Sequence, residues 1–318
     1  MAELGYALSS EEHGPNDLVR NAARAEEAGF GFALISDHYH PWIGTQGEAS
    51  FVWTVLGGIA RETDDIRVGT GVTCPTTRVH PAIVAQAAAT AGDMFDGRFF
   101  LGVGTGERLN EHVLGDRWPP HHIRIDMLEE AVGVIRELWS GGMQSHDGEH
   151  YTVENAELFT LPDEPPEIAV AASGPETAAT AGRIGDALVS TAPTGEVVEA
   201  FVDAADGDAL RYGQATVCWG ETESEARETV HEWWPNGALP GEMGQELAIP
   251  THFEQAAELV TEEDAVEHTP CGPDADRHVE AIEEYVGAGF DQVYVHQIGP
   301  DQAGFLEFYE EEVLPSFE

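Results

Sequence analysis

The residues best suited to acid–base chemistry lie in one short stretch, residues 35–42, which reads Ile-Ser-Asp-His-Tyr-His-Pro-Trp. The apolar run just before it is typical of a buried strand. Residues two apart along an extended chain share a face, so His38, His40 and Trp42 could point the same way. Pro41 lacks an N–H and suits a strand that leads into a loop. We therefore expect a polar, aromatic tip on an apolar strand, which is where α/β proteins carry their active sites.

Candidate groups also follow three later strands: Gly71-Val72-Thr73-Cys74-Pro75, Gly104-Thr105-Gly106-Glu107-Arg108-Leu109-Asn110 and Ala172-Ser173-Gly174-Pro175. Glu107 and His38 can supply an acid and a base if their surroundings separate their pKa values. The glycines are spaced GxGxG and not GxGxxG, so they indicate a flat or large ligand against bare backbone more than a Rossmann site. Ser173 and Gly174 either offer free N–H groups to a phosphate or simply begin a helix.

The pair His38-x-His40 has an alternative interpretation as two metal ligands of a barrel hydrolase. That interpretation needs another histidine and a carboxylate on later strand ends. Among the remaining histidines only His296 lies late in a predicted strand, and no later strand end combines histidine with aspartate. We therefore expect no metal site.

Apolar strands and amphipathic helices alternate along the whole chain. The predicted strands cover residues 5–9, 31–35, 66–72, 98–104, 167–172, 187–191, 214–220 and 292–298. The junctions Ala28-Gly29-Phe30 and Ala288-Gly289-Phe290 repeat one helix-to-strand turn. We predict a (β/α)8 TIM barrel formed by residues 1–318 as a single domain, with insertions after strands 4 and 7 at about 140–166 and 222–266. A doubly wound sheet is the alternative.

Acidic residues dominate the composition. Aspartate and glutamate number 59 against 14 basic residues, and the formal net charge is −45. All the basic residues are arginine, which excludes a lysine Schiff base, a pyridoxal anchor and a P-loop lysine. Such a surface would repel nucleic acids and anionic membranes, so we expect neither as a partner. Adaptation to molar salt, which screens self-repulsion, explains this composition best, and we predict a halophilic protein.

The remaining sequence signals indicate a cytoplasmic protein. No run of roughly 18 apolar residues appears, and the first residues go directly into a predicted strand without a signal segment. Cys74, Cys218 and Cys271 are too few and too far apart for a disulfide framework or a CxxC metal site. We expect free thiols.

With these residues together, the chain resembles the deazaflavin-dependent branch of the bacterial-luciferase-like superfamily, which includes dehydrogenases of glucose 6-phosphate and of secondary alcohols. The resemblance rests on four motifs: Ser36-Asp-His-Tyr-His-Pro-Trp42, Gly69-Thr-Gly-Val-Thr-Cys-Pro75, Gly102-Val-Gly-Thr-Gly-Glu107 with Asn110, and Ala172-Ser-Gly-Pro175. It implies a TIM barrel, coenzyme F420 as cofactor, and hydride transfer between the deazaflavin and a carbinol carbon. It also implies a homodimer.

The resemblance implies a role for each site residue. His38 and Glu107 would be the catalytic acid and base, with the assignment between them open. Trp42 would be the third catalytic residue, holding the substrate and the cation-like carbon that develops. The positions that match cofactor contacts are Asp37, Gly71, Val72, Cys74, Thr105, Gly106, Asn110, Ser173 and Gly174. Gly71-Val72 matches a site where the family carries a cis peptide bond.

One departure from the family concerns the substrate. Sugar-phosphate enzymes of this branch bind phosphate with a threonine, two lysines and an arginine. Thr191 matches the threonine, but the cation positions carry Thr194, Gln255 and Glu267. A pocket without cations and with an added carboxylate disfavours a phosphate dianion, so we predict an uncharged alcohol, aldehyde or sugar as substrate. The alternatives are an FMN-dependent monooxygenase of the same superfamily and a barrel that binds a flavin without turnover.

Overall fold

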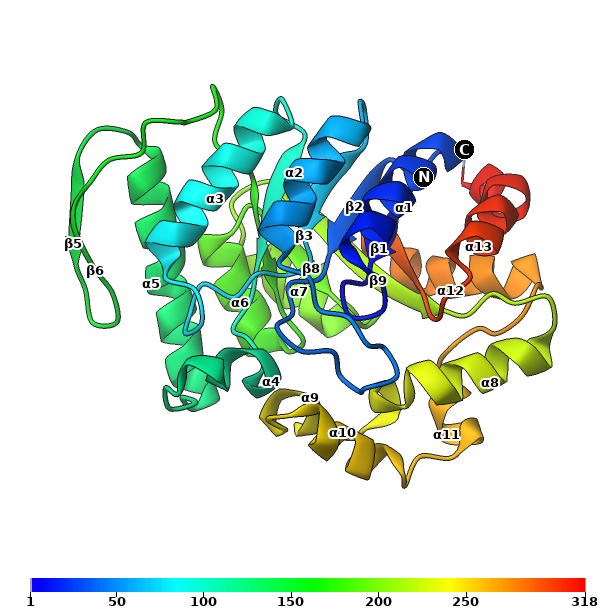
Figure 1. The fold of residues 1–318 in the computed structure, drawn as a ribbon. Helices are drawn as coiled ribbons and strands as arrows, with labels where there is room; N and C mark the ends of the chain where they lie inside the picture. Colours follow the sequence, from blue (N-terminus) through cyan, green and yellow to red (C-terminus); the bar gives the residue numbers. More distant parts are fainter. Residues whose placement is uncertain (1, 318) are drawn as a thin grey trace.

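The chain forms a closed barrel of eight parallel strands in a computed structural model that describes residues 2–317 (Figure 1). The strands are β1 (Glu3–Leu8), β2 (Phe32–Ile35), β3 (Arg67–Thr70), β4 (Phe99–Val103), β7 (Ile168–Ala171), β8 (Ala187–Ser190), β9 (Leu210–Val217) and β10 (Gln292–Gln297). β1 pairs in parallel with both β2 and β10, and this pairing closes the sheet. The predicted TIM barrel is confirmed, and closure rules out the doubly wound alternative.

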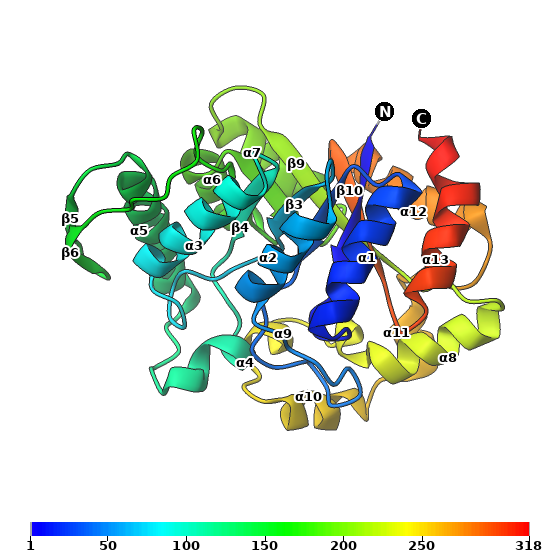
Figure 2. The ribbon, with the colours of Figure 1, turned by 45° about the horizontal axis from the view of Figure 1, so that its top comes forward.

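Helices surround the barrel, as the turned view in Figure 2 shows. They are α1 (Pro15–Ala28), α2 (Val52–Glu62), α3 (Pro81–Met94), α4 (Arg108–Glu111), α5 (His121–Trp139), α6 (Pro175–Ile184), α7 (Gly195–Ala204), α12 (Ala275–Ala288) and α13 (Gln302–Phe308). Short 3₁₀ turns cover His112–Leu114 and Leu314–Ser316, and a π-helical turn covers Tyr309–Val313. Gly29 and Gly289 end α1 and α12 with φ values of 102° and 101°, a left-handed conformation that favours glycine and explains the repeated junction.

Aromatic side chains fill the barrel near the beginnings of its strands. The rings of Phe100 and Tyr212 stack with centroids 5.1 Å apart, and Phe32 meets Tyr212 edge-on at 5.4 Å. Gly69 leaves room for this packing, because a Cβ there would lie 2.2 Å from the Phe100 ring. Since these residues occupy the first half of their strands, the barrel is closed at that end and its cavities open at the other.

Two insertions interrupt the regular alternation. The first is a hairpin of β5 (Gln144–Asp147) and β6 (Thr152–Ala156) beyond α5, projecting from the edge of the molecule in Figure 1. The second follows β9 and contains α8 (Glu223–Trp233), a 3₁₀ turn (Pro235–Ala238), α9 (Met243–Glu246), α10 (Pro250–Ala257) and α11 (Glu262–Val266). It lies across one end of the barrel in both views and supplies residues to a cavity there. The predicted insertions after strands 4 and 7 are therefore present.

Two predicted elements differ from the structure in detail. The predicted strand 214–220 begins four residues earlier, at Leu210. The added residues include Arg211, whose guanidinium is bonded to Asp291 at 2.6 and 2.7 Å. In the hairpin, the sequence pattern predicts a short element over residues 149–153, but residues 149–151 connect the two strands and β6 begins at Thr152.

Candidate active site

Two cavities open at the C-terminal ends of the strands and share part of their walls. The first, of about 220 Å³, is lined by seven of the predicted cofactor residues: Asp37, Gly71, Val72, Cys74, Thr105, Gly106 and Ser173. The second, of about 440 Å³, is lined by Trp42, Thr191 and residues of the second insertion. His38 and Glu107 line both. The acid–base pair therefore stands where the two cavities meet.

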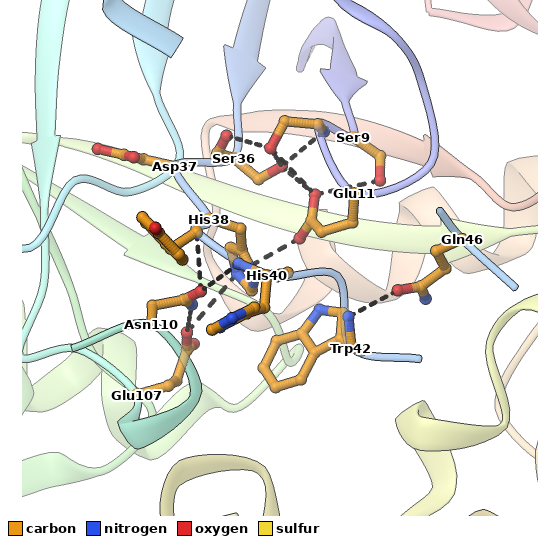
Figure 3. Close-up of polar contacts among 12 residues, drawn as sticks. Ser9, Glu11, Ser36, Asp37, His38, His40, Trp42, Gln46, Glu107 and Asn110 are labelled. Atoms are coloured by element: carbon orange, nitrogen blue, oxygen red, sulfur yellow. Dashed lines mark hydrogen bonds and ion pairs between the residues drawn. The ribbon is translucent and has the colours of Figure 1, made fainter. Parts of the chain in front are cut away.

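His38 lies between two carboxylates (Figure 3). Its Nε2 is 3.3 Å from Oε1 of Glu11 and 3.6 Å from Oε2 of Glu107. Its Nδ1 is 3.2 Å from the carbonyl oxygen of His40, and its ring centroid is 4.9 Å from that of Trp42. The imidazole is thus oriented at one nitrogen by backbone and faces acidic groups with the other.

Glu11 is a functional candidate that the sequence interpretation missed. It follows β1 and is buried, and the hydroxyl of Ser36, which follows β2, donates a hydrogen bond to its carboxylate. The hydroxyls of Ser9 and Ser10 also donate to it, at 3.3 and 3.5 Å. Its position just beyond the first strand was the available signal, since barrel enzymes place reactive groups at strand ends.

Burial and mutual charge shift the pKa values of Glu11, His38 and Glu107 in different directions. Burial by itself would lower the pKa of His38, but the carboxylates of Glu11 and Glu107 outweigh burial and raise it. Burial opposes ionisation of Glu11, yet His38 and the Ser36 hydroxyl lower the pKa of Glu11 below its usual range. Burial raises the pKa of Glu107, whose neighbour His38 offsets this only in part. Glu11 is therefore the more acidic of the two carboxyl groups, whereas His38 and Glu107 hold their protons to higher pH than they would in water.

His40 does not share the face of His38. The alternation of an extended chain does not apply here, because β2 ends at Ile35 and the following residues form a loop. The His40 ring turns toward the segment after β4, with Nδ1 3.0 Å from the carbonyl oxygen of Leu109 and the ring stacked against His112. Among residues 2–317, no cluster of histidine, cysteine and carboxylate groups could hold a metal ion.

Asn110 is buried and connects the loop that follows β2 with Glu107, which follows β4. Its Oδ1 accepts the backbone N–H groups of Tyr39 and His40 at 2.9 and 3.3 Å, and its Nδ2 donates to Oε2 of Glu107 at 3.1 Å (Figure 3). In this arrangement Asn110 positions Glu107 beside His38. Direct contact of Asn110 and Gly174 with a cofactor stays a prediction, because neither lines a cavity.

Asp37 is fixed from two sides. Its carboxylate accepts the Thr73 hydroxyl at 2.8 Å and the guanidinium of Arg78 at 2.9 Å. Arg78 also pairs with the fully buried Glu111, whose carboxylate accepts the Arg78 backbone N–H. Two acids therefore hold Arg78 behind Asp37, which lines the first cavity.

Bare backbone forms part of the wall of the first cavity. The Gly71-Val72 peptide bond is cis, as the family resemblance implies. A Cβ at Gly104 would lie 2.8 Å from Cγ2 of Val72, and Gly106 adopts a φ of 85°. A flat ring can approach such a surface closely, so these residues fit a flavin or deazaflavin.

The second cavity is polar but carries no fixed positive charge. Neither cavity has an arginine among the described residues that line it. Thr191 lines both, whereas Thr194, Gln255 and Glu267 line neither and are exposed. The sequence prediction that Glu267 places a carboxylate in the pocket is wrong, and the acidic groups there are Glu11 and Glu107.

The fold and the site together define a (β/α)8-barrel protein with acid–base residues at the strand ends. Residues 1–292 match the family described as luciferase-like monooxygenase, and the chain belongs to that family. F420-dependent glucose-6-phosphate dehydrogenases of Microbacterium testaceum and Mycolicibacterium smegmatis are 36% and 35% identical to it. These alignments cover 98% and 99% of this chain and 96% and 98% of the relatives.

Solved structures show the same likeness. An F420-dependent secondary alcohol dehydrogenase in complex with an F420–acetone adduct superposes with a TM-score of 0.91 at 28% identity, covering 100% of this chain and 99% of that one. A coenzyme F420-dependent tetrahydromethanopterin reductase from Methanopyrus kandleri shares the fold, with a TM-score of 0.79 at 24% identity and coverage of 100% and 99%. The predicted membership in the F420-dependent branch is confirmed.

The replacement Glu11→Gln tests the charge balance at His38. Removing the nearest carboxylate should lower the pKa of His38 by about one unit, because an adjacent opposite charge stabilises the imidazolium. The protonated form would then disappear at lower pH than in the unaltered protein. The measurement is an NMR titration of histidine ring signals, with His38 assigned from a His38→Gln spectrum. Glu280→Gln on the exposed face of α12 is the control, and an unchanged His38 titration in Glu11→Gln would contradict the electrostatic assignment.

Proposed function

We propose that the protein is a coenzyme F420-dependent oxidoreductase that interconverts an uncharged alcohol and its carbonyl compound. The observation that carries this proposal is the position of His38 and Glu107 at the boundary between a cavity bordered by bare backbone and a polar cavity. The first suits the deazaflavin ring and the second suits the substrate. When bound, coenzyme F420 supplies a ring carbon that accepts or releases a hydride.

The residues around the boundary control the accompanying proton. In alcohol oxidation, neutral His38 takes the hydroxyl proton at Nε2, so the rate rises with pH through the raised pKa of His38. In carbonyl reduction, protonated His38 donates that proton, so the rate falls over the same range. Glu11 holds the imidazole, and Glu107, with its raised pKa, is the second proton carrier. Trp42 packs against His38 and forms the wall beside the substrate.

The electrostatics of the second cavity support an uncharged substrate. Glu11 and Glu107 contribute carboxylates, and histidines are the sole basic side chains among the described residues that line it. A phosphate dianion entering this cavity would meet like charge without a guanidinium or ammonium partner. The relatives in Microbacterium and Mycolicibacterium are named for glucose 6-phosphate, so this proposal separates the chain from them in substrate and not in cofactor.

Cofactor titration and a substrate comparison test the proposal in concentrated KCl. Binding should quench or shift the fluorescence of coenzyme F420. The Kd obtained from this change should be at least about tenfold below the Kd for FMN. Neutral secondary alcohols and sugars should be oxidised with at least about tenfold higher kcat/KM than glucose 6-phosphate. His38→Asn should lower oxidation by roughly 10²–10⁴-fold and retain F420 binding.

Each contrary result identifies another function. Preference for FMN favours a monooxygenase of the same family. Binding of F420 without turnover of any substrate favours a barrel that only binds the cofactor. Efficient use of glucose 6-phosphate overturns the substrate part of the proposal alone.

We also propose that residues 1–318 act as one catalytic unit in the cytoplasm of a halophile. The net charge of −45 and the absence of lysine support growth in molar salt. All three cysteines are free and buried, which fits a reducing compartment. None of the helices within residues 2–317 is long and apolar enough to cross a membrane.

Salt should stabilise the protein strongly. Because self-repulsion falls as the Debye length shrinks from roughly 8 Å to about 3 Å, the urea midpoint should rise steadily between about 0.15 M and about 3 M KCl. Sucrose serves as the control, since it favours compact states without screening charge. Equal urea midpoints at low and high salt would contradict the halophilic assignment.

We further propose that the chain forms a homodimer through α2 and α3. These neighbouring helices border an apolar groove with no charged residue among the described residues that line it. Phe51 and Ile83 are 61% and 57% exposed there, and Met94 is also exposed. A second copy of the same chain could approach this face without bringing carboxylates into contact.

The replacement Ile83→Glu should dissociate the dimer. A carboxylate on the groove would be buried against its own symmetry mate, which disfavours association. Sedimentation in concentrated KCl should give twice the 34.3 kDa chain mass for the unaltered protein and the chain mass for the variant. Leu259→Glu, at an apolar residue that is 85% exposed away from the groove, is the control. A monomer in the unaltered protein would contradict the proposal.

A further inference from the structure

A second glutamate–histidine pair borders the substrate cavity. His296 lies near the end of β10, two residues beyond Tyr294, whose ring packs inside the barrel. Alternation along the strand directs both side chains to the interior. His296 lines the second cavity together with Glu11 and Trp42. Its partner is Glu12, the neighbour in sequence of the carboxylate that contacts His38.

Hydrogen bonding fixes the orientation of the His296 ring. Oε2 of Glu12 is 2.8 Å from Nε2 of His296, and Oε1 of Glu12 accepts the backbone N–H of Gly299 at 2.8 Å. The Glu12 side chain is fully buried, and that of His296 is 4% exposed. A carboxylate accepts and does not donate, so Nε2 carries the hydrogen. The ring of Trp234 lies edge-on to the imidazole with centroids 4.5 Å apart.

The other nitrogen of this ring is unsatisfied. Nδ1 of His296 is buried and has no hydrogen-bond partner among the described residues. Buried polar atoms are normally paired, so an unpaired one calls for an explanation, such as a water molecule or a ligand that reaches it when the cavity wall shifts. The neighbouring cavity wall adds uncharged polar groups from Gln214, Thr216 and Asn236. Such a wall suits hydroxyl groups and not ions.

We propose that Nδ1 of His296 binds a hydroxyl group of the substrate at a carbon other than the one that exchanges hydride. The natural substrate is then a polyhydroxylated neutral molecule, a sugar or polyol, and His296 determines that specificity. Glu12 is the positioning residue that holds the ring. This inference rests on the proposed oxidation of neutral alcohols and assigns a substrate class to it.

The test combines one conservative variant with a series of deoxy sugars. In His296→Gln, the amide nitrogen can replace Nε2 as the donor to Glu12, and Nδ1 is lost, which leaves the amide oxygen on a flexible chain as the remaining acceptor. Glucose and its monodeoxy analogues are compared as substrates with saturating F420, in the unaltered protein and in the variant. His268→Gln, at an exposed position in the second insertion, is the control. F420 titration and urea unfolding show whether the variant keeps its fold and its cofactor site.

The expected result is a specificity that depends on His296. The unaltered protein should lose roughly tenfold in kcat/KM for one monodeoxy analogue, because a buried polar group is left unpaired. His296→Gln should treat glucose and that analogue alike within about twofold, and His268→Gln should keep the tenfold difference. Equal use of all deoxy analogues by the unaltered protein, or an undiminished difference in His296→Gln, would overturn the inference.

The outcome also separates this inference from the function on which it depends. Oxidation of 2-propanol or cyclohexanol without oxidation of glucose would overturn the role of His296 and leave the proposed oxidoreductase intact. Oxidation of no neutral alcohol at all would overturn both.

Discussion

The turn after β1 places two consecutive buried carboxylates against two different histidines, and both parts of the site depend on this arrangement. Glu11 contacts His38, which follows β2, and Glu12 contacts His296, which lies near the end of β10. β1 pairs with both of those strands, so barrel closure brings the two pairs into one cavity wall. Burying an acid in this way is tolerated only with a matched partner. The geometry of the pairs is therefore tied to the integrity of the barrel.

Among the described residues, no arginine lines either cavity, and Arg78 and Arg211 pair with carboxylates instead. Arg78 lies between Asp37 and Glu111, behind the residues that line the first cavity. Arg211 bonds to Asp291 at the start of β9. The cavities themselves have carboxylates, histidines and neutral polar groups. With few cations in the chain and none of them lysine, anion recognition near the substrate has little support, whereas hydroxyl recognition needs no charge. The chain shares its fold with an F420-dependent alcohol dehydrogenase, and the proposed neutral substrate would separate it from the relatives named for glucose 6-phosphate.

Backbone and insertion have complementary roles around His38. At Gly71 and Gly104 the backbone itself forms the wall of the first cavity, so the shape of the wall there is set by the strand ends and not by side-chain rotamers. The second insertion contributes Trp234 and Asn236 to the other cavity, and Gln46 ties the loop after β2 to it through the carbonyl of Trp233 at 2.9 Å. Under the proposed function, the barrel would set the cofactor geometry, and its junction with the insertion would set the substrate choice.

The sequence by itself determined the barrel, the two insertions, and the placement of His38 and Glu107 at strand ends. It could do so because strand periodicity, glycine caps and strand-end motifs are local features. Tertiary structure alone decided which groups meet. Glu12 and His296 are 284 positions apart, and Glu11 reaches His38 only because β1 and β2 are neighbours in the sheet. His40 turned away because β2 ended sooner than the alternation assumed, and the apolar groove arose from two helices that are separate in sequence. Contacts between distant segments leave no signal in the local sequence, so they can be identified only in the folded structure.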